Sequence, residues 1–201
     1  MYAAANSPKV IIFTAPSGSG KTTLVRYLLE QLPCLMFSVS ATTRARRSYE
    51  QDGKDYYFLS PEEFAQKLAD NEFLEWEEVY KNKWYGTLKS EVERIHHLNK
   101  YCIFDVDVQG ALSIKKYYGN DALSVFVKVP NLEVLRQRLM ARHTETPENL
   151  DTRLQKAAEE IQFASLFDVV IINDELEKAK AEALNLVIQF LETPCEKLCE
   201  E

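Results

Sequence analysis

The chain has 201 residues, a length that fits one domain. Its 46% hydrophobic and 27% charged residues are typical of a soluble globular protein and exclude a chain that is disordered throughout. The 24 lysines and arginines are outnumbered by 31 aspartates and glutamates, and the net charge of −7 argues against a dedicated DNA- or RNA-binding module.

Location and redox state follow from the apolar runs and the cysteines. The sequence contains no apolar run near the roughly 20 residues that a membrane-spanning helix needs. Residues 1–8 lack the basic start and apolar core of a signal peptide, so we expect a cytoplasmic protein without membrane contact. Cys102 lies in an apolar run and is expected to be buried and reduced. Cys195 and Cys199 lie in an acidic tail, 193–201, whose role the sequence leaves open.

Short apolar segments rich in β-forming residues alternate along the chain with segments that have helical apolar spacing. The expected strands are 9–14, 35–40, 56–59, 73–80, 101–106, 123–129 and 168–172. The expected helices are 22–32, one that begins with the capping box at 60–63, 87–98, 108–118, one that begins after Asn131, one that carries residues 150–161, and 176–191. This alternation predicts right-handed βαβ units, and therefore an α/β fold with a mainly parallel sheet flanked by helices.

The segment between the first expected strand and the first expected helix predicts a phosphate-binding loop. It reads Ala15-Pro16-Ser17-Gly18-Ser19-Gly20-Lys21-Thr22. Gly18 and Gly20 leave the backbone N–H groups open to a phosphate chain, Lys21 can reach the β- and γ-phosphates, and the Thr22 hydroxyl suits Mg²⁺. Ala15 stands where the usual P-loop pattern has a glycine. The alternative is a glycine-rich turn that only caps the helix.

A cluster of arginines narrows the type of nucleotide-binding protein. Arg44, Arg46 and Arg47 lie within four residues of an acidic chain, and guanidinium groups match phosphate oxygens bidentately. A solvated basic turn is the alternative interpretation. A P-loop alone leaves GTPases, ATPases and small-molecule kinases open, but the chain lacks the N-K-x-D signature of GTPases.

These arginines belong to a series of blocks in a fixed order. After the P-loop come Ser40 to Arg47 (S-x-x-T-R-x-x-R), Asp55-Tyr56-Tyr57-Phe58, Glu72-Phe73-Leu74-Glu75, Trp84-Tyr85-Gly86-Thr87 and Phe104-Asp105-Val106-Asp107-Val108-Gln109-Gly110. In this order the sequence resembles the guanylate kinases, P-loop enzymes that phosphorylate GMP. The resemblance continues through Arg138, Arg142, Arg153 and Ile172-Asn173-Asp174, and it covers residues 8–192.

The resemblance implies a GMP site. The residues that would hold the GMP phosphate are Arg44, Arg47, Tyr56 and Tyr85, and those that would contact the guanine or the sugar are Ser40, Glu75, Thr87 and Asp107. The chemistry agrees for Glu75, because an ionised carboxylate accepts from both N1–H and the 2-amino group of guanine, a pair of donors that adenine lacks. The local sequence pattern favours a surface carboxylate of a strand, and only the match to the ordered blocks reverses this interpretation of Glu75.

The resemblance also implies an ATP site and moving parts. ATP would be bound by residues 15–22 and Asn173, and Mg²⁺ by Thr22 and Asp105, although the sequence does not separate the roles of Asp105 and Asp107. The catalytic residues would be Lys21, Arg44, Arg138, Arg142 and Arg153. A GMP-binding segment of about 39–90 and a lid of about 132–163 would close on the core.

The activity implied is the reaction of ATP with GMP to give ADP and GDP, with Mg²⁺ as cofactor. The substrates are small molecules; use of dGMP and the oligomeric state stay open. Arg46, Tyr49 and His143 depart from the family pattern and bear on the shape of the phosphate loop and lid. Two alternatives remain: a non-catalytic module of this type that binds proteins, although Gly20-Lys21-Thr22 is retained, and another nucleoside monophosphate kinase, although the D-G-F-P-R block of adenylate kinases is missing.

Overall fold

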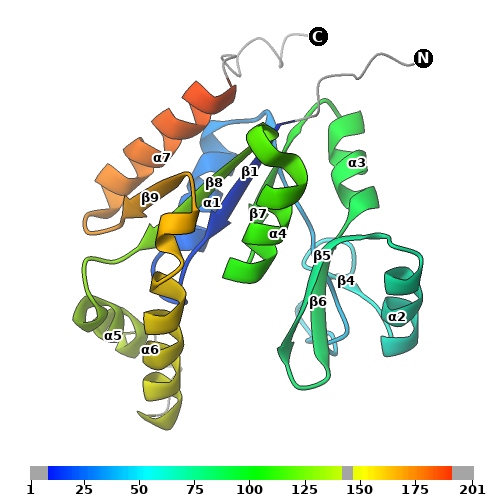
Figure 1. Cartoon of the computed structure of the whole chain (residues 1–201), viewed down its shortest axis with the longest axis horizontal. Helices are drawn as coiled ribbons and strands as arrows, with labels where there is room; N and C mark the ends of the chain where they lie inside the picture. The colour runs from blue at the N-terminus through cyan, green and yellow to red at the C-terminus, as the bar shows by residue number, and fades with distance from the viewer. Residues whose placement is uncertain (1–8, 142–146, 192–201) are drawn as a thin grey trace.

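The structure is a computed structural model that describes residues 9–141 and 147–191. Within these ranges a five-stranded sheet forms the centre of the molecule, with the order β2-β7-β1-β8-β9 (Figure 1). Its strands are β1 (Val10–Thr14), β2 (Leu35–Phe37), β7 (Tyr101–Asp105), β8 (Ala122–Lys128) and β9 (Val169–Ile172). Each neighbouring pair is parallel. The predicted α/β fold with a mainly parallel sheet is therefore confirmed.

Helices cover both faces of this sheet, which explains why the first four residues of β1 are all apolar. Successive side chains of a strand point to opposite faces. Ile11 and Phe13 pack with α1 (Lys21–Gln31) and α7 (Leu176–Leu191). Val10 and Ile12 pack on the other face with α3 (Lys89–His97) and α4 (Val108–Tyr118). All four side chains are fully buried, as expected for a parallel sheet enclosed by two helical layers.

A smaller sheet with the order β4-β3-β6-β5 lies to one side of the core within the same described ranges (Figure 1). Its strands are β3 (Ala41–Thr42), β4 (Tyr57–Phe58), β5 (Phe73–Tyr80) and β6 (Lys83–Leu88). Helix α2 (Pro61–Ala69) packs Phe64 against Phe73 of this sheet, with ring centroids 4.3 Å apart. The expected capping box is present, because the Ser60 hydroxyl accepts from Glu63 N and the Glu63 carboxylate from Ser60 N.

Two predictions of secondary structure near this sheet are wrong. Residues 87 and 88 were expected to begin a helix, but they end β6, because Thr87 pairs with Glu75 of β5 and holds the chain extended. The strand expected over 35–40 ends at Phe37, and the chain then crosses to the second sheet as β3. The other expected strands and helices occur at the expected places, whereas β3 and β6 were not expected as strands.

Two helices lie on the other side of the core from the second sheet (Figure 1). They are α5 (Leu132–Met140) and α6 (Pro147–Ile161), and Leu135, Leu139 and Ala157 pack together between them. Asn131 caps α5 as expected, since its side chain accepts from Val134 N at 2.9 Å. Two short 3₁₀ turns, Gly119–Asp121 and Ala164–Leu166, precede β8 and β9.

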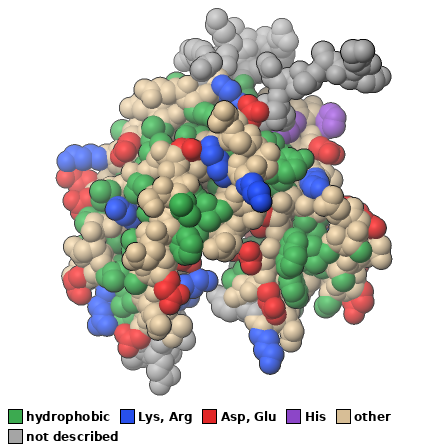
Figure 2. Space-filling model, in the orientation of Figure 1, with side chains coloured by type: hydrophobic (Ala, Val, Ile, Leu, Met, Phe, Trp, Pro, Cys, Tyr) green, Lys and Arg blue, Asp and Glu red, His purple; other side chains and the backbone are tan. Residues whose placement is uncertain are grey.

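The surface carries charged side chains of both signs. On the face shown in Figure 2, lysine and arginine side chains lie interspersed among aspartates and glutamates. Among the described residues, no helix is long and apolar enough to cross a membrane. Cys102 is fully buried as a free thiol, as expected, whereas Cys195 and Cys199 lie outside the described residues.

Candidate active site

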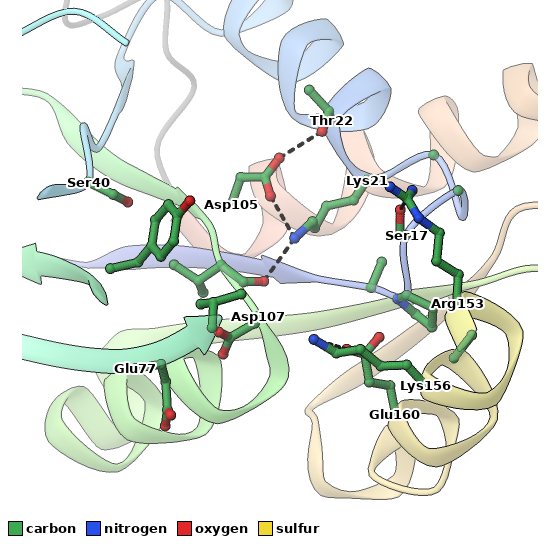
Figure 3. Close-up of a pocket in the computed structure, with 18 of the residues that line it drawn as sticks. Ser17, Lys21, Thr22, Ser40, Glu77, Asp105, Asp107, Arg153, Lys156 and Glu160 are labelled. Atoms are coloured by element: carbon green, nitrogen blue, oxygen red, sulfur yellow. Dashed lines mark hydrogen bonds and ion pairs between the residues drawn. The ribbon is translucent and has the colours of Figure 1, made fainter. Parts of the chain in front are cut away.

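A cleft with a volume of about 440 Å³ opens at the carboxyl ends of β1 and β7. This is the edge at which parallel sheets bind ligands, because the loops that follow the strands meet there. The P-loop forms one wall, residues of the second sheet form another, and α6 lies at the side (Figure 3). The cleft therefore brings together segments that are far apart in the sequence.

The P-loop presents the N-terminus of α1 to this cleft. Gly20 is the residue before the helix and has a φ of +96°, a conformation that side chains disfavour. A Cβ at Gly20 would also collide with the Asn173 side chain. Asn173 is buried at the loop, where its Nδ2 donates to the Ser19 carbonyl at 2.8 Å. Because the first backbone N–H groups of a helix have no partners within the helix, this end is suited to bind an anion.

Lys21, Thr22 and Asp105 form a polar cluster at the floor of the cleft (Figure 3). Lys21 Nζ lies 2.6 Å from one oxygen of Asp105 and donates to the Val106 carbonyl at 2.9 Å. The Thr22 hydroxyl donates to the other oxygen of Asp105 at 2.9 Å. The cluster places a cation beside two oxygen groups of the type that Mg²⁺ prefers.

Glu75 is a buried carboxylate in the wall formed by the second sheet. Its side chain accepts from the Thr87 hydroxyl at 2.6 Å. Gly110 at the start of α4 allows close packing, since a Cβ there would lie 2.8 Å from Glu75 Oε2. Burial, together with the nearby carboxylates of Asp107 and Glu77, outweighs the opposing hydrogen bond from Thr87 and raises the pKa of Glu75 to about 7. Protonated and ionised forms of Glu75 are thus both accessible near neutral pH.

Arg44 is held in place by Glu50, a carboxylate that was not expected from the sequence to belong to the site. Its guanidinium donates to both oxygens of Glu50, at 2.8 and 3.0 Å, and lies 5.2 Å from the Tyr56 ring centroid. Glu50 also accepts from the backbone N–H of Arg47 at 2.7 Å. The hydrogen bonds from Arg44 lower the pKa of Glu50 to about 2, so it stays ionised. The Arg47 side chain is exposed and donates to the Tyr49 hydroxyl.

The arginines expected in the lid lie at two places. Arg153 of α6 reaches into the cleft and donates to the Ser17 hydroxyl at 3.2 Å (Figure 3). Arg138 of α5 donates to the Asn173 carbonyl at 2.9 Å, outside the cleft lining. Arg142 lies outside the described residues. Arg153 therefore contacts the P-loop itself, whereas Arg138 contacts the loop that follows β9.

Most of the site residues expected from the sequence meet in this one cleft. Those that line it are Ala15, Pro16, Ser17, Gly18, Gly20, Lys21, Thr22, Ser40, Tyr56, Glu75, Tyr85, Asp105, Asp107 and Arg153. Those outside the lining are Ser19, Arg44, Arg47, Thr87, Arg138 and Asn173. Thr87 and Asn173 contact lining residues from behind.

Other residues of this cleft were not expected from the sequence, among them Glu77, Lys156 and Glu160. Lys156 and Glu160 follow Arg153 at intervals that place all three on one face of a helix, so helical spacing could have found them. Glu77 lies two residues after Glu75 on the same face of β5, and period-two spacing could have found it. Glu50 has no such local signal.

A P-loop at the carboxyl edge of a parallel sheet is typical of the P-loop nucleotide-binding proteins. The buried carboxylate that faces it across the cleft indicates a second ligand site. The family model described as guanylate kinase matches residues 7–190. The chain is 55% identical to a guanylate kinase of Bacteroides fragilis over 183 residues, which is 91% of this chain and 90% of the relative. It is 52% identical to a guanylate kinase of Porphyromonas gingivalis, over 91% of this chain and 98% of that one.

A solved structure agrees with these sequence relatives. The crystal structure of guanylate kinase from Anaplasma phagocytophilum superposes with a TM-score of 0.73 and 28% identity, covering 95% of this chain and 90% of the other. The chain belongs to the guanylate kinase family. The resemblance stated from the sequence blocks is confirmed.

Proposed function

We propose that this chain transfers the γ-phosphoryl group of ATP to GMP, giving ADP and GDP. The observation that carries the proposal is that the P-loop and the buried Glu75 line the same cleft. A phosphate-binding helix end suits the donor nucleotide, and a carboxylate facing the cleft suits a guanine acceptor. Membership of the guanylate kinase family supports the same reaction.

Guanine recognition rests on Glu75. When ionised, its carboxylate would accept from the N1–H and the 2-amino group of guanine, while Thr87 orients it from behind. The Ser40 hydroxyl lines the same cleft and would contact the ring. A site built on such hydrogen bonds can reject a base that lacks these donors by a factor of about 10⁴–10⁵.

The phosphate of GMP would be bound at the aromatic and arginine side of the cleft. Tyr56 and Tyr85 line it, with ring centroids 5.9 Å apart. Arg44 lies next to Tyr56 and is oriented by Glu50. Arg47 is exposed and would join when the segment closes on GMP. The GMP phosphate oxygen would then attack the γ-phosphorus in line with the departing ADP.

The donor site would be formed by residues 15–22 and Asn173. Asn173 Oδ1 is buried with no hydrogen-bond partner among the described residues, so it can accept from the adenosine of ATP. Thr22 and Asp105 would hold Mg²⁺, because their hydroxyl and carboxylate oxygens suit this cation. When bound, Mg²⁺ neutralises charge on the β- and γ-phosphates. Lys21 would hold the transferring group from the P-loop side.

Closure would exclude water from the reaction. We propose that the segment of about 39–90 and the lid of about 132–163 move toward the core when both nucleotides bind. Arg153, together with Arg138 and Arg142, would bring positive charge to the transferring phosphoryl group. Preorganised charge of this kind supplies most of the catalysis in phosphoryl transfer. We also propose that the protein acts in the cytoplasm.

The test is ADP formation from MgATP with GMP, compared with AMP, CMP and UMP as acceptors. Turnover with GMP alone is expected. Turnover with a different acceptor would retain the P-loop argument and refute the role of Glu75. A folded protein that binds GMP and produces no ADP would favour a non-catalytic binding module.

A further inference from the structure

The polypeptide crosses from the central sheet to the second sheet within a very short stretch. Ser38 N donates to the Ile103 carbonyl of β7 at 3.0 Å, so Ser38 belongs to the central sheet. The Ser40 carbonyl accepts from Tyr57 N at 2.9 Å, so Ser40 already belongs to the second sheet. Val39 is the link between the two bonds. Val39 is therefore one of the connections that place the second sheet relative to the core.

Glu91 of α3 binds this link directly. Its carboxylate accepts from Val39 N at 3.1 Å and from the Tyr57 hydroxyl of β4 at 2.8 Å. Arg94 completes the set, donating Nε at 2.8 Å and Nη2 at 2.9 Å. One carboxylate thus joins the connecting residue, a strand of the second sheet and the helix that follows β6.

The helix that carries Glu91 is anchored on the core. Val92 and Ile95 of α3 are buried in the cluster that contains Ile12 and Phe104 of the central sheet. Glu91 itself is only 2% exposed. Burial by itself would raise the pKa of Glu91, but the hydrogen bonds from Arg94 and the other partners outweigh it and hold the pKa below its ordinary value. A buried, ionised carboxylate with all these donors is a rigid point of attachment.

Glu91 binds Val39 and Tyr57, and a sequence neighbour of each of these residues lines the cleft. Ser40 follows Val39, and Tyr56 precedes Tyr57. We propose that Glu91 is a positioning residue for GMP, which fixes the second sheet on the core so that Ser40 and Tyr56 face the P-loop across the cleft. This inference rests on the proposed function, because it takes GMP as the ligand that binds in this part of the cleft. Glu91 does not line the cleft, so its effect is transmitted through the backbone.

The main test is the substitution Glu91→Ala, read out by calorimetric titration with GMP alone and by steady-state kinetics. Loss of the attachment is expected to raise the Kd and the KM for GMP about tenfold, with the KM for MgATP changed less than about twofold. Glu91→Gln is expected to recover most of the affinity, because an amide oxygen can still accept from Val39 N. A folded Glu91→Ala protein with an unchanged Kd for GMP would overturn the proposal, as would equal increases in both KM values.

A second substitution keeps the test decisive if Glu91→Ala does not fold. Tyr57→Phe removes a single hydroxyl and leaves the other contacts of Glu91 in place, so the Kd for GMP should rise about threefold. An unchanged Kd in this variant overturns the proposal.

The matched control is Asp168, a carboxylate that also joins a backbone N–H, a hydroxyl and a cation. It accepts from Ser124 N at 2.8 Å and from the Ser124 hydroxyl at 2.7 Å, and Lys115 Nζ lies 2.8 Å away. These partners belong to β8 and α4 of the core. Asp168→Ala is expected to lower the midpoint of thermal unfolding and to leave the Kd for GMP unchanged. An equal loss of GMP affinity in both alanine variants would mean that general destabilisation explains the effect, and would overturn the proposal.

Wild-type turnover separates this proposal from the proposed function. Absence of GMP phosphorylation by wild-type protein would refute the proposed activity, whereas the calorimetric titration tests Glu91 without any turnover.

Discussion

Replacing Glu75 by glutamine should stabilise the protein in a pH-dependent way. Burial raises the pKa of Glu75 from 4.5 to about 7 in the folded protein. Between these values the unfolded chain has lost the proton of this carboxyl group while the folded chain still holds it. The free energy of unfolding therefore falls as the pH rises. At about 1.4 kcal/mol per pH unit, the loss between the two pKa values amounts to about 3 kcal/mol.

Glutamine removes this titration and can keep the local structure. Its Oε1 can accept from the Thr87 hydroxyl as Glu75 does. The difference in unfolding free energy between Glu75→Gln and wild type should be constant below about pH 4.5, grow up to about pH 7 and then level off. Urea unfolding, followed by tryptophan fluorescence at a series of pH values, measures it. The variant should gain about 3 kcal/mol relative to wild type between pH 4 and pH 8.

Glu77→Gln is a graded control for this experiment. Burial also raises the pKa of Glu77, which is half-buried, so its pH-dependent difference should have the same sign and be smaller. If the difference in unfolding free energy between Glu75→Gln and wild type does not vary with pH, the pKa of Glu75 is not raised in the folded protein. A carboxyl group with the same pKa in both states adds no pH dependence to the unfolding free energy.

The same titration should govern binding of the base. Guanosine affinity of wild type should fall about tenfold from pH 8 to pH 6, as the ionised fraction of Glu75 falls from about nine-tenths to one-tenth. Guanosine is the better probe, because the phosphate of GMP itself titrates near pH 6. Undiminished guanosine affinity at pH 6 would show that the ionised carboxylate is not the recognising form.

Three further substitutions test the rest of the site. Lys21→Ala should lower kcat by a factor of about 10²–10³ in a protein that still folds, since it removes a cation at the phosphates; wild-type turnover would contradict this role. Glu50→Gln removes one of the two carboxylate oxygens that accept from Arg44, so the KM for GMP should rise about tenfold while the KM for MgATP stays constant. Equal changes in both KM values would refute this role of Glu50. Gly20→Ala should abolish ATP binding in a titration and lower stability by about 1 kcal/mol, because φ is +96° and Asn173 occupies the Cβ position; retained ATP affinity would refute it.

Features that depend on contiguous residues could be predicted from the sequence. A strand, a glycine-rich turn and a helix start lie within 9–22, so the P-loop could be recognised from local spacing. The mostly apolar strands Val10–Thr14 and Ala122–Lys128 follow from burial on both faces of a parallel sheet. Glu75 was selected through the ordered blocks that resemble guanylate kinases, since its local pattern favours a surface strand.

Features that depend on partners far along the chain could not be predicted from the sequence and are seen in the folded structure alone. Thr87 ends a strand because Glu75 of β5 pairs with it, although the segment had helical spacing. Glu91 holds Val39, 52 residues away, and no periodicity in the sequence marks that contact. The pKa of Glu75 likewise depends on burial between β5 and α4, which the sequence alone does not specify. Local spacing determines the elements, whereas the energies of the site arise from packing between them.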